Sequence, residues 1–334
     1  MKRTKHATTS LFLLISLALP AFPRTNESER FKAASDYSKR SLGVALLIMK
    51  GEEIVLEEYG ASAGARIPWV IASGTKSFSG VMLAAAIEDG LISSFDEKVS
   101  ETIVEWKEDP TKRDITLRQL LSLTSGIEGG GAINVPAYKD SIQSRITSEN
   151  GKLFQYGPNP FQIFGEVMTR KLRPSKESVR DYLERRIFRP IGMNVSLWRR
   201  IETDPILSNG MALTARDWAR FGMFLRDRGR IGDRRVISAK LFDELLKGSE
   251  ANPAYGITFW LNRSGFRPNG GLFEMFESEA DESLGNDIFM AAGLGNQRLY
   301  VIPSQNLVVV RFGAFGRFND SEFLKLLLRA RSEK

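Results

Sequence analysis

The stretch 70–80, VIASGTKSFSG, contains the two side chains with the clearest capacity for chemistry, Ser73 and Lys76. A spacing of three residues places both on one side of a helical turn, where they can share a proton. A lysine packed beside the alanine-rich segment that follows loses hydration, which lowers its pKa and makes it a base for a serine nucleophile. A simpler interpretation also fits: Ser73 caps a helix and Lys76 is exposed to solvent.

The rest of the composition excludes the commoner partners of a catalytic serine. The chain has no cysteine, and its only histidine is His6, close to the N-terminus. If that start is removed as a signal, a Ser-His-Asp triad, a cysteine nucleophile and a metal held by histidine or thiolate are all excluded. A serine hydrolase with this composition needs Lys, Tyr or a carboxylate as its base, and we expect no metal and no cofactor.

Strands at both ends of the chain and helices between them must position this pair. The sequence predicts a hairpin over 43–60 that turns at residues 50–51, and a buried helix over 77–90. Apolar residues recur at helical spacing over 115–124, 161–172, 178–188, 214–227 and 321–332, and strand-like runs cover 255–261, 287–292, 297–303 and 306–313. This order predicts an α+β fold: an antiparallel sheet built from both chain ends, flanked by helices, with an inserted helical lobe.

The first 22 residues have the pattern of an export signal. A basic start precedes the apolar run 11–22, which is shorter than the ~20 residues that span a bilayer. We therefore expect a periplasmic or secreted bacterial protein with no stable membrane span after cleavage; a short signal-anchor is the alternative. The expected divisions are a signal peptide over 1–22, a polar segment over 23–40 and one domain over 41–334.

Charged stretches offer a different kind of function. The formal net charge is +7, and it falls by three to +4 without the basic residues of the predicted signal. The densest basic stretch, 226–235, suits binding of an anionic polymer, whereas its glycines and aspartates favour a solvated helix end and turn. The acidic stretch 276–287 lacks the ligand spacing of a calcium loop and is expected to be solvated. We expect no nucleic-acid partner.

Several segments, in order, resemble one family. The first motif of the serine β-lactamase and penicillin-binding-protein superfamily is similar to VIASGTKSF, and the resemblance is strongest to its class C, DD-peptidase and esterase branch. Further segments resemble that branch over about residues 40–317: ITLRQLLSLTSGI (115–127), RIFRPIGM (186–193), NGMALTARDWARFG (209–222), YGITFWL (255–261) and NQRLYVIPSQNLVVVRFG (296–313). The resemblance implies a β-lactamase/transpeptidase-like fold and acyl transfer through an ester on Ser73.

The second and third motifs of the family are altered here. Tyr156 matches the tyrosine of Tyr-x-Asn, nine residues before Gly165, but Pro158 occupies the asparagine position and Asn159 follows one residue late. The Lys-Thr-Gly motif becomes Ala291-Ala292-Gly293-Leu294. The resemblance implies that Lys76 and Tyr156 move protons, that backbone N–H groups of Ser73 and Leu294 form the oxyanion hole beside Gly293, and that Asn159 replaces the amide donor.

These departures bear on the substrate. In the family, the cation of the third motif holds a substrate carboxylate, so its loss favours an esterase or amidase acting on a small, less anionic substrate, including a peptidoglycan-derived one. Arg298 or Arg311 could restore a positive charge. The alternatives are a D-Ala-D-Ala carboxypeptidase of the penicillin-binding type and a catalytically silent relative that binds an envelope ligand.

Overall fold

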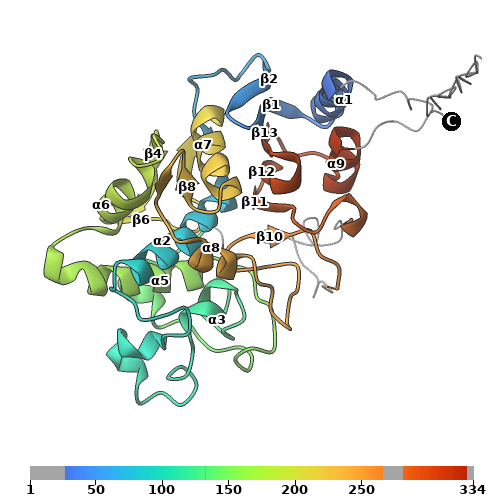
Figure 1. Cartoon of the computed structure of the whole chain (residues 1–334). Coiled ribbons are helices and arrows are strands. Elements are labelled where there is room, and N and C mark those ends of the chain that lie inside the picture. The colour runs from blue at the N-terminus through green and yellow to red at the C-terminus, as the bar shows by residue number, and fades with distance from the viewer. Residues whose placement is uncertain (1–26, 132, 266–280, 329–334) are drawn as a thin grey trace, which may run out of the picture.

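A six-stranded antiparallel sheet lies at the centre of the computed structural model, which describes residues 27–131, 133–265 and 281–328. The strand order is β10-β11-β12-β13-β1-β2, so the N-terminal hairpin joins the C-terminal strands (Figure 1). The strands are β1 (Gly43–Lys50), β2 (Glu53–Tyr59), β10 (Trp260–Leu261), β11 (Phe289–Gly293), β12 (Gln297–Ile302) and β13 (Leu307–Gly313). The predicted sheet from both chain ends is confirmed.

The two faces of the sheet bury separate apolar cores. Because side chains alternate along a strand, Leu47 and Val310 face the large core shared with the helical lobe, whereas Leu46 and Val309 face the opposite side. Two terminal helices, α1 (Glu27–Arg40) and α9 (Asp320–Leu328), pack side by side on that opposite side (Figure 1).

The helical lobe occupies the middle of the chain, as predicted. Its helices are α2 (Ser77–Glu88), α3 (Leu117–Leu121), α4 (Tyr138–Ser141), α5 (Asn159–Leu172), α6 (Val179–Leu183), α7 (Ala215–Arg226) and α8 (Ala239–Leu245). Short 3₁₀ turns occupy Ala72–Lys76, Val99–Glu101, Val104–Trp106 and Arg173–Ser175 here, and a π-helical turn occupies Glu184–Phe188. Short strands complete it: β3 (Trp69–Val70), β4 (Leu197–Trp198), β5 (Arg200–Ile201), β6 (Asp204–Pro205), β7 (Met211–Leu213), β8 (Arg230–Ile231) and β9 (Arg234–Arg235).

Helix α2 lies at the junction of lobe and sheet. Its residues from Ser77 to Ala86 are buried, as expected for a helix that is apolar around its whole circumference. The Phe78 ring stacks on Phe221 of α7 with 4.1 Å between centroids. Helix α7 in turn packs on β12 and β13. The residues just before α2 are therefore held rigidly at the end of the sheet.

Two sequence predictions need correction. Residues 23–40 were expected to form a polar segment outside the domain, but Glu27–Arg40 forms α1, which buries Phe31 and Ala34 against the sheet. The predicted strand 255–261 is limited to Trp260–Leu261. Thr258 has a φ of +73°, and the Gly256 N–H donates to the Phe259 carbonyl at 2.9 Å, so a tight turn replaces the first part of that strand.

The remaining elements agree with the predictions apart from small shifts at their ends. The hairpin turns at residues 51–52, one position later than predicted, and Gly51 adopts a φ of +61°. Among the described residues, no helix is both long and apolar enough to cross a bilayer. The same residues contain no cluster of three acidic, histidine or cysteine side chains suited to a metal ion. The predicted signal peptide 1–22 lies outside the described part of the chain.

Candidate active site

Ser73 lies within a 3₁₀ turn, Ala72–Lys76, that leads directly into α2. The turn begins in strained backbone, because Ala72 has a φ of +46°. Ile71 caps the turn without a side-chain hydrogen bond, and Lys76 occupies the corresponding position of α2. Ser73 is therefore not a helix cap, and the simpler interpretation of the 70–80 stretch is wrong. Its half-buried side chain is left available to solvent and to Lys76.

Lys76 is buried, with only 4% of its surface exposed. Its ammonium Nζ donates to Ser73 Oγ at 3.0 Å and to the Ser208 carbonyl oxygen at 2.8 Å. Throughout the described ranges, no carboxylate forms an ion pair with it. Burial therefore lowers the pKa of Lys76 to about 7, from an ordinary value of 10.5. A neutral amine at this position can accept the Ser73 hydroxyl proton.

Two aromatic rings flank the same nitrogen. Lys76 Nζ lies 4.8 Å from the centroid of the Tyr156 ring and 5.3 Å from that of Phe161. Such contacts stabilise an ammonium by about 0.5–2 kcal/mol, which opposes the effect of burial only in part. The structure thus brings Ser73, Lys76 and Tyr156 together, as the sequence predicted, although their chemical roles remain predictions.

A cluster of aromatic rings fixes Tyr156 next to Lys76. Its ring stacks on Trp260 of β10 with centroids 5.8 Å apart and meets Tyr255 edge-on at 6.3 Å. Phe154 packs against Tyr255 and Trp260 at 5.2 and 5.9 Å. Burial and the neighbouring Tyr156 raise the pKa of Tyr255 well above its usual value, so Tyr255 stays protonated. Three rings from two segments therefore hold Tyr156 in one orientation.

The end of β11 approaches the Ser73 turn closely. A β-carbon on Gly293 would lie 2.1 Å from the Ile71 carbonyl oxygen and 3.2 Å from the Gly74 nitrogen, so only glycine allows this contact. Leu294 follows at once, and 44% of its surface is exposed. The backbone of residues 293–294 therefore lies beside the Ser73 turn, the place that the family resemblance implies for the second oxyanion donor.

Asn159 begins helix α5 and is nearly buried. Its N–H donates to the Gly129 carbonyl at 3.0 Å, and its side-chain oxygen packs against Gly130, where a β-carbon would lie 2.2 Å away. The side chain thus faces the loop 129–130, while the second polar partner of Lys76 is the Ser208 carbonyl. The role of Asn159 as amide donor stays a prediction.

The suggestion that Arg298 or Arg311 supplies the missing cation is wrong. Both are fully buried on the α1/α9 side of the sheet. Each lies two residues from Tyr300 or Val309 along its strand and therefore points to the same face as that residue. Arg298 binds Asp320 through two bonds of 2.8 and 3.0 Å. Arg311 donates to the Ser41 and Asn296 carbonyls at 2.6 and 2.8 Å. Neither guanidinium reaches the face that carries Ser73.

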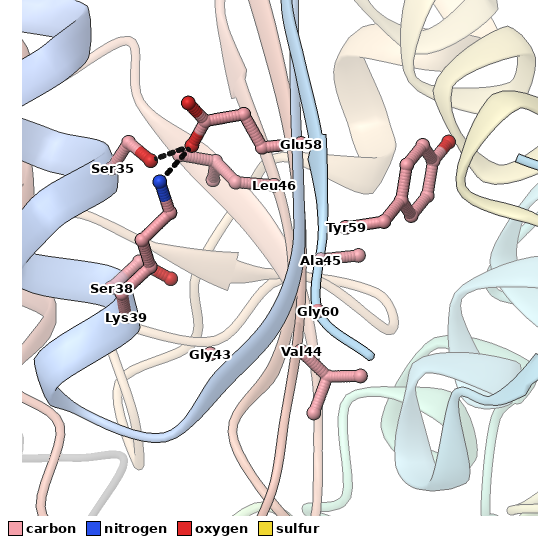
Figure 2. Close-up of a pocket in the computed structure, with 10 residues that line it drawn as sticks. All are labelled: Ser35, Ser38, Lys39, Gly43, Val44, Ala45, Leu46, Glu58, Tyr59 and Gly60. Atoms are coloured by element: carbon pink, nitrogen blue, oxygen red, sulfur yellow. Dashed lines mark hydrogen bonds and ion pairs between the residues drawn. The ribbon is translucent and has the colours of Figure 1, made fainter. Parts of the chain in front are cut away.

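Two other charged regions contain local ion pairs. In the basic stretch 226–235, Arg226 pairs with Asp227 and Arg228 with Asp243. A pocket of about 140 Å³ lies between α1 and the β1–β2 edge, where Ser35, Lys39 and Glu58 converge (Figure 2). Lys39 Nζ is 2.7 Å from Glu58, and its hydrogen bond lowers the Glu58 pKa. The pocket lies among α1 side chains, apart from the Ser73 turn.

Sequence reasoning missed the Ser208 carbonyl and the ring support of Tyr156. A backbone carbonyl has no side-chain signature, although the family-like segment 209–222 begins directly after it. Phe161 was assigned only to a helix. Trp260 and Tyr255 fell within a predicted strand, so the turn that brings both rings to Tyr156 was not apparent.

Comparisons with known proteins identify the family and the fold. A family model described as Beta-lactamase matches residues 28–322. EstCE1, described as a hydrolase with promiscuous acyltransferase activity, has a TM-score of 0.69 and 14% identity, with 91% of this chain and 99% of the other covered. A penicillin-binding protein homologue from Caulobacter crescentus has a TM-score of 0.67 and 15% identity, covering 90% and 96%. A family VIII carboxylesterase has a TM-score of 0.65 and 17% identity, covering 90% and 95%. The predicted fold is confirmed.

Proposed function

The chain belongs to the beta-lactamase family, and on that premise we propose that it hydrolyses an ester or amide through an acyl-enzyme on Ser73. The observation that carries this proposal is the state of Lys76. A buried lysine without a carboxylate partner, 3.0 Å from a serine hydroxyl, reduces the stability of the fold, and groups of this kind are concentrated at functional sites. As a base with a pKa of about 7, it is matched to catalysis near neutral pH.

The proposed reaction has two halves. In the first, neutral Lys76 takes the Ser73 proton, Ser73 Oγ attacks the substrate carbonyl carbon, and the resulting oxyanion is stabilised by the N–H groups of Ser73 and Leu294. The bond to the leaving group then breaks, Tyr156 gives its proton to that group, and Tyr156 regains a proton from the Lys76 ammonium, which becomes neutral again. In the second, water attacks the acyl-enzyme, the same groups move its proton, and the carboxylic acid and Ser73 are released.

The lining of the site favours a substrate without a carboxylate at the third-motif position. Strand β11, which borders the Ser73 turn, carries no charged residue from Phe289 to Gly293. Arg298 and Arg311 are engaged on the other side of the sheet. A D-Ala-D-Ala peptide ends in a carboxylate that would lose water there without gaining a cation. An uncharged ester or amide suits the site better, in keeping with the carboxylesterase and the acyltransferase-like hydrolase among the structural neighbours.

Active-site labelling tests the acyl-enzyme. We expect a fluorophosphonate probe to label the wild type and a variant with the exposed serine Ser93→Ala equally, and to leave Ser73→Ala unlabelled. Equal labelling of Ser73→Ala, or an unlabelled wild type, would contradict the proposal.

Turnover assays test the substrate class. A chromogenic ester, a chromogenic cephalosporin and a D-Ala-D-Ala peptide are compared at equal enzyme concentration. We expect the ester to give the highest kcat/KM, with loss of that activity in Ser73→Ala. Preferential cleavage of the peptide would make the protein a carboxypeptidase instead.

A further inference from the structure

The segment 293–296, which consists of the last residue of β11 and the loop to β12, contains left-handed backbone. We name it the oxyanion turn, because Leu294 lies within it. Gly295 and Asn296 have φ values of +78° and +59°, so two successive residues are left-handed. Glycine adopts this conformation freely, whereas Asn296 does so at a cost that contacts around the turn offset.

That support comes from the Gln297 side chain. Its amide nitrogen lies 3.3 Å from the Leu294 carbonyl oxygen, 3.0 Å from that of Gly295 and 2.9 Å from that of Gly313. Its amide oxygen accepts the Gly313 N–H at 3.0 Å. With 4% of its surface exposed, this one side chain ties the oxyanion turn to the end of β13.

Two arginines hold the same turn from the other face of the sheet. Arg311 Nη1 donates to the Asn296 carbonyl at 2.8 Å, and Arg298 Nη1 lies 3.4 Å from the Gly293 carbonyl oxygen. Gln297, by contrast, points to the same face of β12 as Leu299, which is the face where β12 meets the Ser73 turn. Arg298 thus contacts the carbonyl of the peptide that carries the Leu294 N–H, and Gln297 contacts the next carbonyl, that of Leu294 itself.

We propose that Gln297 is a positioning residue that fixes the Leu294 N–H toward the oxyanion. The role rests on the proposed function. An oxyanion donor stabilises the transition state only if it points at the developing charge, and loss of such a donor lowers kcat about 10²–10³-fold. A donor that is displaced but still present should lose less, and the binding of the ground-state substrate should change little.

The test compares two buried amides that hold backbone turns. Asn262 donates to the Asp281 and Gly285 carbonyls at 2.8 and 2.7 Å, in a turn away from Ser73, and so provides the matched control. Gln297→Met and Asn262→Leu both remove the amide and retain much of its volume. Gln297→Glu is the second variant: it keeps an oxygen that accepts the Gly313 N–H and replaces the amide donors with an oxygen that repels the carbonyls they bind.

We expect kcat for the chromogenic ester to fall about 10–100-fold in Gln297→Met and Gln297→Glu, with KM changed less than about threefold. The affinity for a phenylboronic acid, whose tetrahedral serine adduct imitates the oxyanion, should fall by a similar factor. Asn262→Leu should keep kcat within about twofold of the wild type, at a melting temperature comparable to that of Gln297→Met.

Three results would overturn the role of Gln297. They are an unchanged kcat in Gln297→Glu, a kcat loss in Asn262→Leu as large as in Gln297→Met, and a Gln297→Met defect confined to the melting temperature. Failure of the proposed function is visible separately, since a wild type that neither labels nor hydrolyses the ester removes the reaction itself.

Discussion

Buried cations lie on both faces of the central sheet, and they are treated in opposite ways. On the lobe side, Lys76 has a serine hydroxyl and a backbone carbonyl as hydrogen-bond partners. On the α1/α9 side, Arg298 forms a two-bond ion pair with Asp320, whose carboxylate also accepts the Tyr300 hydroxyl, and Arg311 lies 3.9 Å from the centre of the Phe318 ring.

The difference shows how one fold separates reactivity from stability. Arg298 and Arg311 are directly opposite each other on β12 and β13, where like charges repel, so Asp320 is needed to offset them. Burial lowers the pKa of Arg311 only to about 10, and it remains charged at neutral pH. Lys76 lacks such compensation, and burial shifts its pKa to the range where it can exchange a proton.

Removal of the lysine amine should have the largest effect on activity and the opposite effect on stability. We expect Lys76→Met to lower kcat/KM for the ester about 10³–10⁴-fold, since it loses the general base. It should also raise the free energy of unfolding by on the order of 2–4 kcal/mol at pH 7, because the variant no longer buries a group whose folded pKa lies below its unfolded value.

The pH dependence of that stability gives a sign test. Between about pH 7 and 10.5, the unfolded chain binds a proton that folded Lys76 has released, so wild-type stability gains from this group as the pH rises. Urea unfolding of both proteins across this range measures it, and the difference between them should shrink with increasing pH. A difference independent of pH would contradict the assignment.

Removal of the Asp320 carboxylate, on the other face of the sheet, should reduce stability more than activity. We expect Asp320→Asn to reduce the free energy of unfolding by about 3–5 kcal/mol, because two buried guanidinium groups would lose their counter-charge. Urea unfolding measures the loss, and the activity per folded molecule should fall less than tenfold. A destabilisation below about 1 kcal/mol would show that the two faces do not differ as described.

The smallest expected change in free energy concerns Tyr156. We expect Tyr156→Phe to lower kcat about 10²-fold and to leave stability nearly unchanged, since the ring keeps its stacking on Trp260 and its face toward Lys76. Turnover of esters with leaving groups of increasing basicity measures the role, because poorer leaving groups should suffer more. A uniform loss across the series would assign the hydroxyl to binding instead of proton transfer.

Much of the fold was predictable because its signals are local. Strand and helix patterns at both chain ends gave the mixed sheet, and the family-like segments fall in order along the chain. Helix α1 was missed because its surface is highly polar and only a few residues, such as Phe31 and Ala34, face the sheet. The turn at Gly256 and Thr258 was missed because a φ of +73° at a threonine arises from tertiary packing.

The parts of the site that depend on side-chain type and spacing were predictable. Ser73, Lys76 and Tyr156 were identified from spacing and resemblance, and they meet in the structure. The structural role of Arg298 was not predictable. The face of the sheet that it occupies depends on how β12 pairs with β11, and its ion-pair partner Asp320 lies 22 residues further along the chain. The role of the Ser208 carbonyl was not predictable either, because every residue has a backbone carbonyl.

The central claim is that Lys76 is largely uncharged just above neutral pH because it is buried without a carboxylate. The most direct measurement is an NMR titration of protein labelled with ¹³C at the lysine ε-carbons, with Lys76→Met used to assign the resonance. We predict a midpoint near pH 7 for Lys76. A midpoint near its ordinary value of 10.5 would contradict the account, because Ser73 would then face a permanent cation instead of a base.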